Sequence, residues 1–111
     1  LFVCDSDQEG LEVAEAGLAR YKAHLLDARV RFNPGGAPPP PPGTPPPASE
    51  MVEHAFLAGT PATVAGKMEE LRDLGVRNVL LNPNVGQIPS KQVEKSLRMF
   101  GEQVLPKFKD E

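Results

Sequence analysis

The sequence lacks most of the residues that would mark a thiol, metal or phosphate site. Its one cysteine, Cys4, excludes an internal disulfide, and because it lies in an apolar run we expect a core residue rather than a nucleophile. The two histidines, His24 and His54, have no partner at metal-ligand spacing, so we predict no metal site and a structural or surface role for both. No cluster of glycines between a strand and a helix provides a phosphate-binding fingerprint.

An excess of positive charge and a long apolar run are also missing. The chain carries 12 Lys and Arg against 15 Asp and Glu, a net charge of -3, which disfavours binding to the phosphate backbone of nucleic acid. No apolar run is long enough to span a membrane, and no signal peptide is recognisable in the sequence. We therefore expect a cytoplasmic protein with neither a nucleic-acid nor a membrane partner.

The second half of the chain predicts a helix, a buried strand and a further helix. Thr60 and Pro61 are typical of a helix start and Gly75 of a helix end, and the apolar residues between them recur on one face: Val64, Met68, Leu71 and Leu74. Residues 76–81 (VRNVLL) form a short apolar run typical of a parallel strand covered on both faces. A last helix is expected before Pro106, with an apolar face of Val93, Leu97, Phe100 and Val104. This pattern indicates an α/β fold.

The first half begins with an apolar strand, residues 1–4, that leads into a helix. Ser6 and Glu9 form a candidate capping box at the start of this helix. Its apolar residues trace a helical stripe: Leu11, Ala14, Leu18, Tyr21 and Leu25. Gly10 and Gly17 weaken the prediction slightly, because an interior glycine costs about 1 kcal/mol relative to alanine.

Proline dominates the segment between the two halves. Residues 33–48 hold nine of the 13 prolines, so this segment cannot form a helix or a sheet. We predict a flexible loop with extended or polyproline II backbone, followed by a short helix or turn over residues 49–55. The chain is thus divided into residues 1–32, a proline-rich loop at residues 33–48, and residues 49–111.

Four motifs, in this order, resemble the luciferase-like flavin-dependent monooxygenase family. They are residues 2–9 (FVCDSDQE), 59–64 (GTPATV), 74–81 (LGVRNVLL) and 96–108 (SLRMFGEQVLPKF). That family folds as a (β/α)8 TIM barrel. The resemblance implies that this chain is the C-terminal part of such a barrel, about its last two β/α units, with the proline-rich loop interrupting it.

In that barrel, residues 1–4 would be the seventh strand and residues 76–81 the eighth. Two parallel strands alone leave unpaired edges, which also indicates a fragment of a larger protein. The missing N-terminal part of the barrel is therefore an expected partner. The proline-rich loop falls where the family has a variable loop over its active site.

The resemblance also implies an oxidoreductase whose difficult chemistry belongs to its cofactor. In the family, reduced flavin (FMN) activates molecular oxygen to oxidise a small organic substrate, and some relatives instead use a deazaflavin for hydride transfer. The residues that grip the flavin phosphate and act as acid and base lie on earlier strands. We therefore expect no catalytic residue in this chain and no turnover by the fragment alone.

Four polar residues at the predicted strand ends are candidates for lining the pocket. Asp5 and Ser6 follow the first strand, and Asn82 and Asn84 follow residues 76–81, at the carboxyl edge where ligands bind in α/β folds. The residue types favour a structural alternative for each pair. Asp5 and Ser6 are typical of helix caps, and Asn82 and Asn84 are typical of turns.

Two functions of other classes stay open. The prolines between Pro38 and Pro47 would suit the aromatic groove of a proline-recognition domain, which makes the chain a binding module. Alternatively, a small α/β protein with a structural role would complete its unpaired strands with another copy, as a homo-oligomer.

Overall fold

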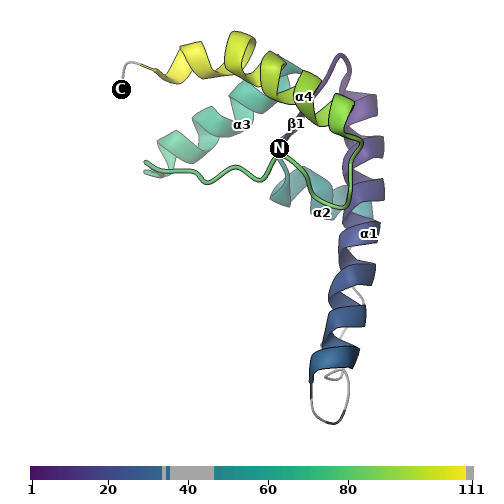
Figure 1. Ribbon diagram of the computed structural model, residues 1–111. Coiled ribbons are helices and arrows are strands. Elements are labelled where there is room, and N and C mark those ends of the chain that lie inside the picture. Colours follow the sequence, from purple (N-terminus) through teal and green to yellow (C-terminus); the bar gives the residue numbers. More distant parts are fainter. Residues whose placement is uncertain (34, 36–46, 110–111) are drawn as a thin grey trace.

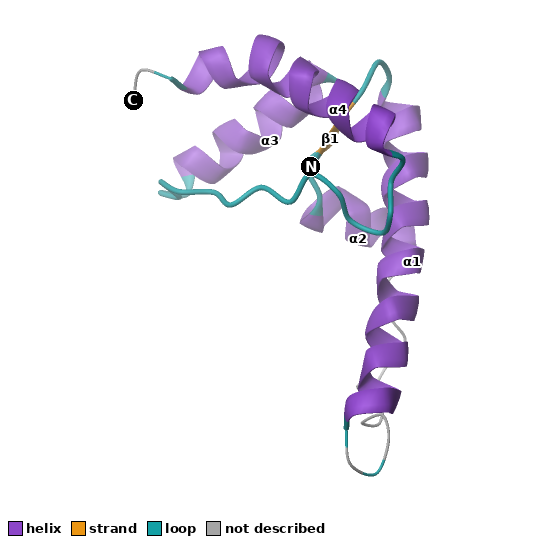
Figure 2. Ribbon diagram, viewed as in Figure 1, coloured by secondary structure: helices purple, strands orange, loops and turns teal. Residues whose placement is uncertain are grey.

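The computed structural model of the chain describes residues 1–33, 35 and 47–109. The elements follow in the order β1 (Phe2–Val3), α1 (Asp7–Phe32), α2 (Ala48–Ala55), β2 (Ala58–Gly59), α3 (Pro61–Asp73) and α4 (Ser90–Met99), which continues into a π-helical turn (Phe100–Val104) and a 3-10 turn (Leu105–Phe108) (Figure 2). The short helix expected near residues 49–55 is confirmed as α2. Most of the proline-rich loop, and with it the proposed proline-recognition segment, lies outside the described residues.

Strand β1 pairs with β2 in a parallel two-stranded sheet. Phe2 lies opposite Ala58 and Val3 opposite Gly59. The backbone N–H of Phe2 donates to the carbonyl of Leu57 at 2.7 Å, and that of Cys4 donates to the carbonyl of Gly59 at 2.9 Å. The strand at the start of the chain is thus confirmed. Strand β2 was not predicted, because two residues are too few to show an alternating pattern.

The other edge of β1 is closed by groups that do not belong to a strand. The backbone N–H of Val3 donates to the hydroxyl oxygen of Ser96 on α4 at 2.8 Å, and the backbone nitrogen of Leu1 donates to the carbonyl of Asn82 at 2.9 Å. Ser96 is fully buried, so its hydroxyl satisfies a donor that water cannot reach. A helix side chain therefore stands where a further strand would pair.

Residues 76–81 do not form the buried strand predicted for them. They have no regular secondary structure, and Leu80 is fully exposed while Val76 and Val79 are each about 40% exposed. A parallel strand buried on both faces needs a neighbour and two covering layers, and in the described part of the chain the edge of β1 is already taken by Ser96. The strand prediction is wrong for this structure, whereas the two-stranded sheet neither supports nor contradicts the barrel.

The end of α3 is confirmed at Gly75. Its φ of 90° lies in the left-handed region, its N–H donates to the carbonyl of Arg72 at 2.9 Å, and the N–H of Val76 donates to the carbonyl of Leu71 at 3.0 Å. These two bonds form a Schellman motif, which glycine favours because it has no Cβ to clash at positive φ.

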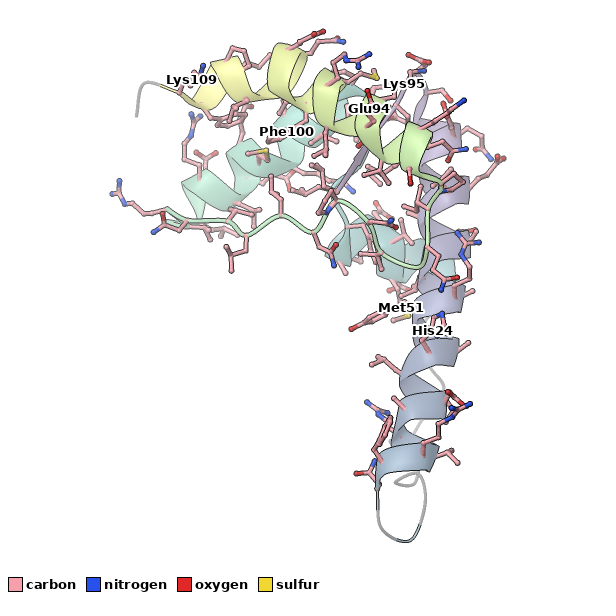
Figure 3. All side chains as sticks on the ribbon, viewed as in Figure 1. His24, Met51, Glu94, Lys95, Phe100 and Lys109 are labelled. Carbon is pink, nitrogen blue, oxygen red and sulfur yellow. The ribbon has the colours of Figure 1, made fainter. Side chains whose placement is uncertain are left out.

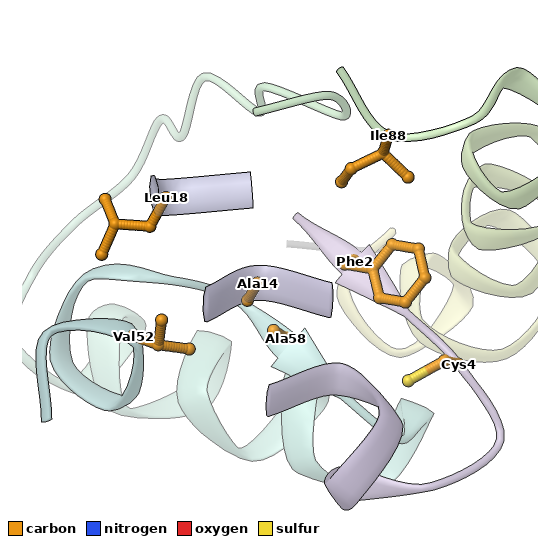
Figure 4. Close-up of a cluster of buried hydrophobic side chains, with 7 residues drawn as sticks. All are labelled: Phe2, Cys4, Ala14, Leu18, Val52, Ala58 and Ile88. Carbon is orange, nitrogen blue, oxygen red and sulfur yellow. The ribbon is translucent and has the colours of Figure 1, made fainter. Parts of the chain in front are cut away.

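Two apolar clusters lie on opposite faces of the sheet. The first contains Phe2, Cys4, Ala14, Leu18, Val52, Ala58 and Ile88 (Figure 4). The second contains Leu1, Val3, Val64, Ala65, Phe100 and Val104. Successive residues of a strand point to opposite faces, so Phe2 faces α1 and α2 while Val3 faces α3 and the C-terminal helical turns. This small sheet therefore connects the two halves of the chain.

Helix α1 reaches this core through two glycines. A Cβ on Gly10 would lie 2.6 Å from the backbone nitrogen of Gly59, and a Cβ on Gly17 would lie 2.4 Å from the carbonyl oxygen of Val85. These contacts explain why residues that weaken an isolated helix occur here, because only glycine lets the helix backbone approach β2 and the loop at Val85 so closely.

The apolar stripe predicted for α1 is only half buried. Ala14 and Leu18 are buried, but Tyr21 is 45% exposed and Leu25 is 38% exposed. Figure 1 shows the reason: the C-terminal half of α1 extends away from the body formed by the other helices. Periodicity identified the helix correctly but gave no information on where its tertiary contacts end.

The last helix was predicted with one error in its buried face. Phe100 and Val104 are buried as expected, but Leu97 is 44% exposed and Ser96 takes the buried position. Sequence polarity favoured leucine, whereas the N–H of Val3 needs an acceptor, which the Ser96 hydroxyl supplies at 2.8 Å. The helix also changes to a π-helical turn at Phe100, and Pro106 lies within the 3-10 turn that follows.

None of the helices in the described ranges is both long enough and apolar enough to cross a membrane.

We expect Gly10→Ala to destabilise the fold. The added Cβ would displace the backbone of β2, at a cost of about 1–3 kcal/mol in the free energy of unfolding. Gly66→Ala is the matched control, because Gly66 lies in α3 with open space around its Cβ, and it should raise stability by about 0.5–1 kcal/mol. Urea unfolding followed by circular dichroism measures both. A gain for Gly10→Ala would show that α1 does not lie against β2.

We also expect Ser96→Ala to destabilise the fold, by about 1–3 kcal/mol, because it leaves the buried N–H of Val3 without an acceptor. Ser90→Ala, at the exposed start of α4, should change stability by no more than about 0.5 kcal/mol. Equal effects of the two substitutions in the same urea assay would contradict the role given to the Ser96 hydroxyl.

Candidate functional site

The carboxyl end of β1 is a meeting point of two helix starts. Ser6 has an extended backbone (φ -144°, ψ 150°) and its hydroxyl accepts a hydrogen bond from the N–H of Glu9 at 3.1 Å. Thr60 does the same for α3, accepting from the N–H of Thr63 at 3.3 Å. The capping role predicted for Ser6 is thus confirmed, and the hydroxyl is used in the fold.

Asp7 links these two helix starts, and sequence reasoning gave it no role. Its Oδ1 accepts a hydrogen bond from the N–H of Thr60 at 2.9 Å, although Asp7 itself lies in the first turn of α1. The N–H of Thr60, and then the side chain of Thr63, lower the pKa of the Asp7 carboxyl below its usual value. An acidic residue in the first turn of a helix is a signal that could have drawn attention to Asp7. No sequence pattern indicates its partner Thr60, which is 53 residues away.

Asp5 points toward α4 instead of capping a helix. Its Oδ2 lies 2.5 Å from the Nζ of Lys95, and both side chains are more than half exposed. The hydrogen bond to Asp5 raises the pKa of Lys95. Exposed ion pairs of this kind contribute little to stability, because water screens both charges. Figure 3 shows Lys95 at the outer surface of α4.

Asn82 and Asn84 organise a turn. The side-chain oxygen of Asn82 accepts from the N–H of Asn84 at 3.1 Å. The side-chain amide of Asn84 binds both backbone groups of Ile88, accepting from its N–H at 2.8 Å and donating to its carbonyl at 3.2 Å. The turn alternative is therefore what this structure shows, and it positions Ile88 in the first apolar cluster.

The structure does not bring the two candidate pairs together. The carbonyl of Asn82 binds the backbone nitrogen of Leu1, which places Asn82 beside the amino end of β1. Asp5 and Ser6 follow its carboxyl end. The expected common edge required a strand at residues 76–81 parallel to β1, and that strand is not formed.

Asn82 does line a hollow, of about 690 Å³, between α2, α3 and residues 79–82. His54 and Lys67 are the basic residues at its wall. The Nζ of Lys67 donates to the carbonyls of Glu53 at 3.0 Å and Phe56 at 3.1 Å, so it caps the end of α2. A second hollow, of about 510 Å³, lies between α3 and the C-terminal turns, where the Arg72 guanidinium is 5.7 Å from the Phe108 ring centre.

The described residues include no buried side-chain N or O atom that lacks a hydrogen-bond partner. Over the same residues, His, Cys, Asp and Glu side chains form no group of three suited to a metal. Cys4 is buried, and burial raises the pKa of its thiol, so it behaves as a core residue.

Comparison with known proteins gives one informative similarity. Over 61 residues the chain is 39% identical to a 5,10-methylenetetrahydromethanopterin reductase from Methanopyrus kandleri. The matched region is 55% of this chain but 16% of the reductase, so the chain corresponds to a small part of that enzyme's length. No protein-family model and no solved structure matches the chain. The similarity is partial support for the luciferase-like resemblance, and the relative is by name a reductase.

We expect Asp7→Ala to lower the free energy of unfolding by about 1 kcal/mol near neutral pH, because the start of α3 loses a charged acceptor. The pKa of Asp7 is lower in the folded than in the unfolded state. Its contribution is therefore complete above the unfolded pKa, about 4, and is lost as the pH falls through the folded pKa. The stability difference between the two proteins should shrink in that acid range.

Asp73→Ala is the matched control for this measurement. Asp73 is an exposed aspartate at the end of α3, where a negative charge opposes the helix dipole, so its removal should be neutral or slightly stabilising. Urea unfolding at a series of pH values compares the three proteins. A pH-independent difference for Asp7→Ala would exclude the charged carboxylate as the stabilising group.

Proposed function

We propose that this chain is the C-terminal part of an oxidoreductase of the luciferase-like barrel family. The observation that carries the proposal is the 39% identity over 61 residues to a reductase, together with four motifs in the order that the family has. In the proposed enzyme, residues 1–4 are a strand of the barrel. The chain alone is proposed to be inactive, since it corresponds to a small part of the relative's length.

Within this family, we propose a deazaflavin rather than FMN as the cofactor. The relative is by name a reductase of a methylene compound. Such a reduction needs a hydride donor and does not use oxygen, and a deazaflavin supplies hydride, whereas reduced FMN with oxygen suits a monooxygenase. A small organic molecule that accepts hydride is therefore the proposed substrate class.

In such an enzyme, the polar residues of this chain mainly hold the helix starts and the loop in position. Ser6, Asp7 and Thr60 fix the starts of α1 and α3 at the carboxyl end of the sheet. In a barrel this is the face that carries the active site. Asn82 and Asn84 are proposed to shape the loop before α4 through their bonds to the backbone.

The proposal is tested first by reading the gene upstream of the codon for Leu1. A reading frame that continues for about two hundred residues with further strand-helix units supports the barrel. The complete protein is then purified and mixed, without oxygen, with a reduced deazaflavin and a panel of imine and methylene-pterin substrates, while the deazaflavin absorbance is followed.

Return of the oxidised deazaflavin absorbance, dependent on both substrate and enzyme, is the expected result. Reduced FMN in air with the same protein is the control for the monooxygenase alternative. Turnover only with FMN and oxygen would replace the cofactor assignment and keep the family. A start codon immediately before Leu1, or no redox activity with either cofactor, would overturn the proposed function.

A further inference from the structure

We draw no further inference here: the strongest candidate, the exposed apolar surface on the C-terminal half of α1 that includes Leu26 and Val30, carries none because nothing in the structure shows what covers it.

Discussion

The fold depends on one short strand, β1, whose backbone N–H groups are hydrogen-bonded on both edges. Phe2 donates to the carbonyl of Leu57 and Cys4 to the carbonyl of Gly59, while Val3 donates to the buried hydroxyl of Ser96. Because the side chains of β1 alternate, the same strand joins an apolar cluster shared with α1 and α2 to another shared with α3 and the C-terminal turns. An unpaired backbone donor at this position would be costly, since both clusters exclude water. The Ser96 hydroxyl therefore joins α4 to the edge of β1.

The polar groups at the carboxyl end of β1 are likewise used in the structure. Ser6 caps α1, Asp7 binds the start of α3, and Asp5 pairs with Lys95. Such groups fix the position of a sheet edge. In the proposed oxidoreductase the difficult chemistry would belong to a cofactor. The similarity to a reductase over part of the chain is the reason to place this sheet edge in an enzyme at all.

Local signals in the sequence predicted the elements well. Ser6, Thr60, Pro61 and Gly75 marked helix ends that the structure has, since capping depends on residues within one turn. The turn at Asn82 and Asn84 was also foreseeable from residue type. Residues 76–81 and Leu97 were assigned wrongly because burial of an apolar residue depends on neighbours distant in the sequence. They are exposed because the two edges of β1 are paired with Ser96 and β2.

The sequence by itself therefore determined the helices, their caps and the strand at residues 1–4, because these depend on backbone sterics and on hydrogen bonds between near neighbours. Only the tertiary structure decided that Ala58–Gly59 pairs with β1, that Asp7 reaches Thr60, and that Gly10 allows α1 to touch β2. It also decided that the C-terminal half of α1 extends away from the core, with Leu26 58% and Val30 55% exposed. Each of these depends on contacts between residues about fifty positions apart or on the point where a helix leaves the core, and no local pattern encodes either.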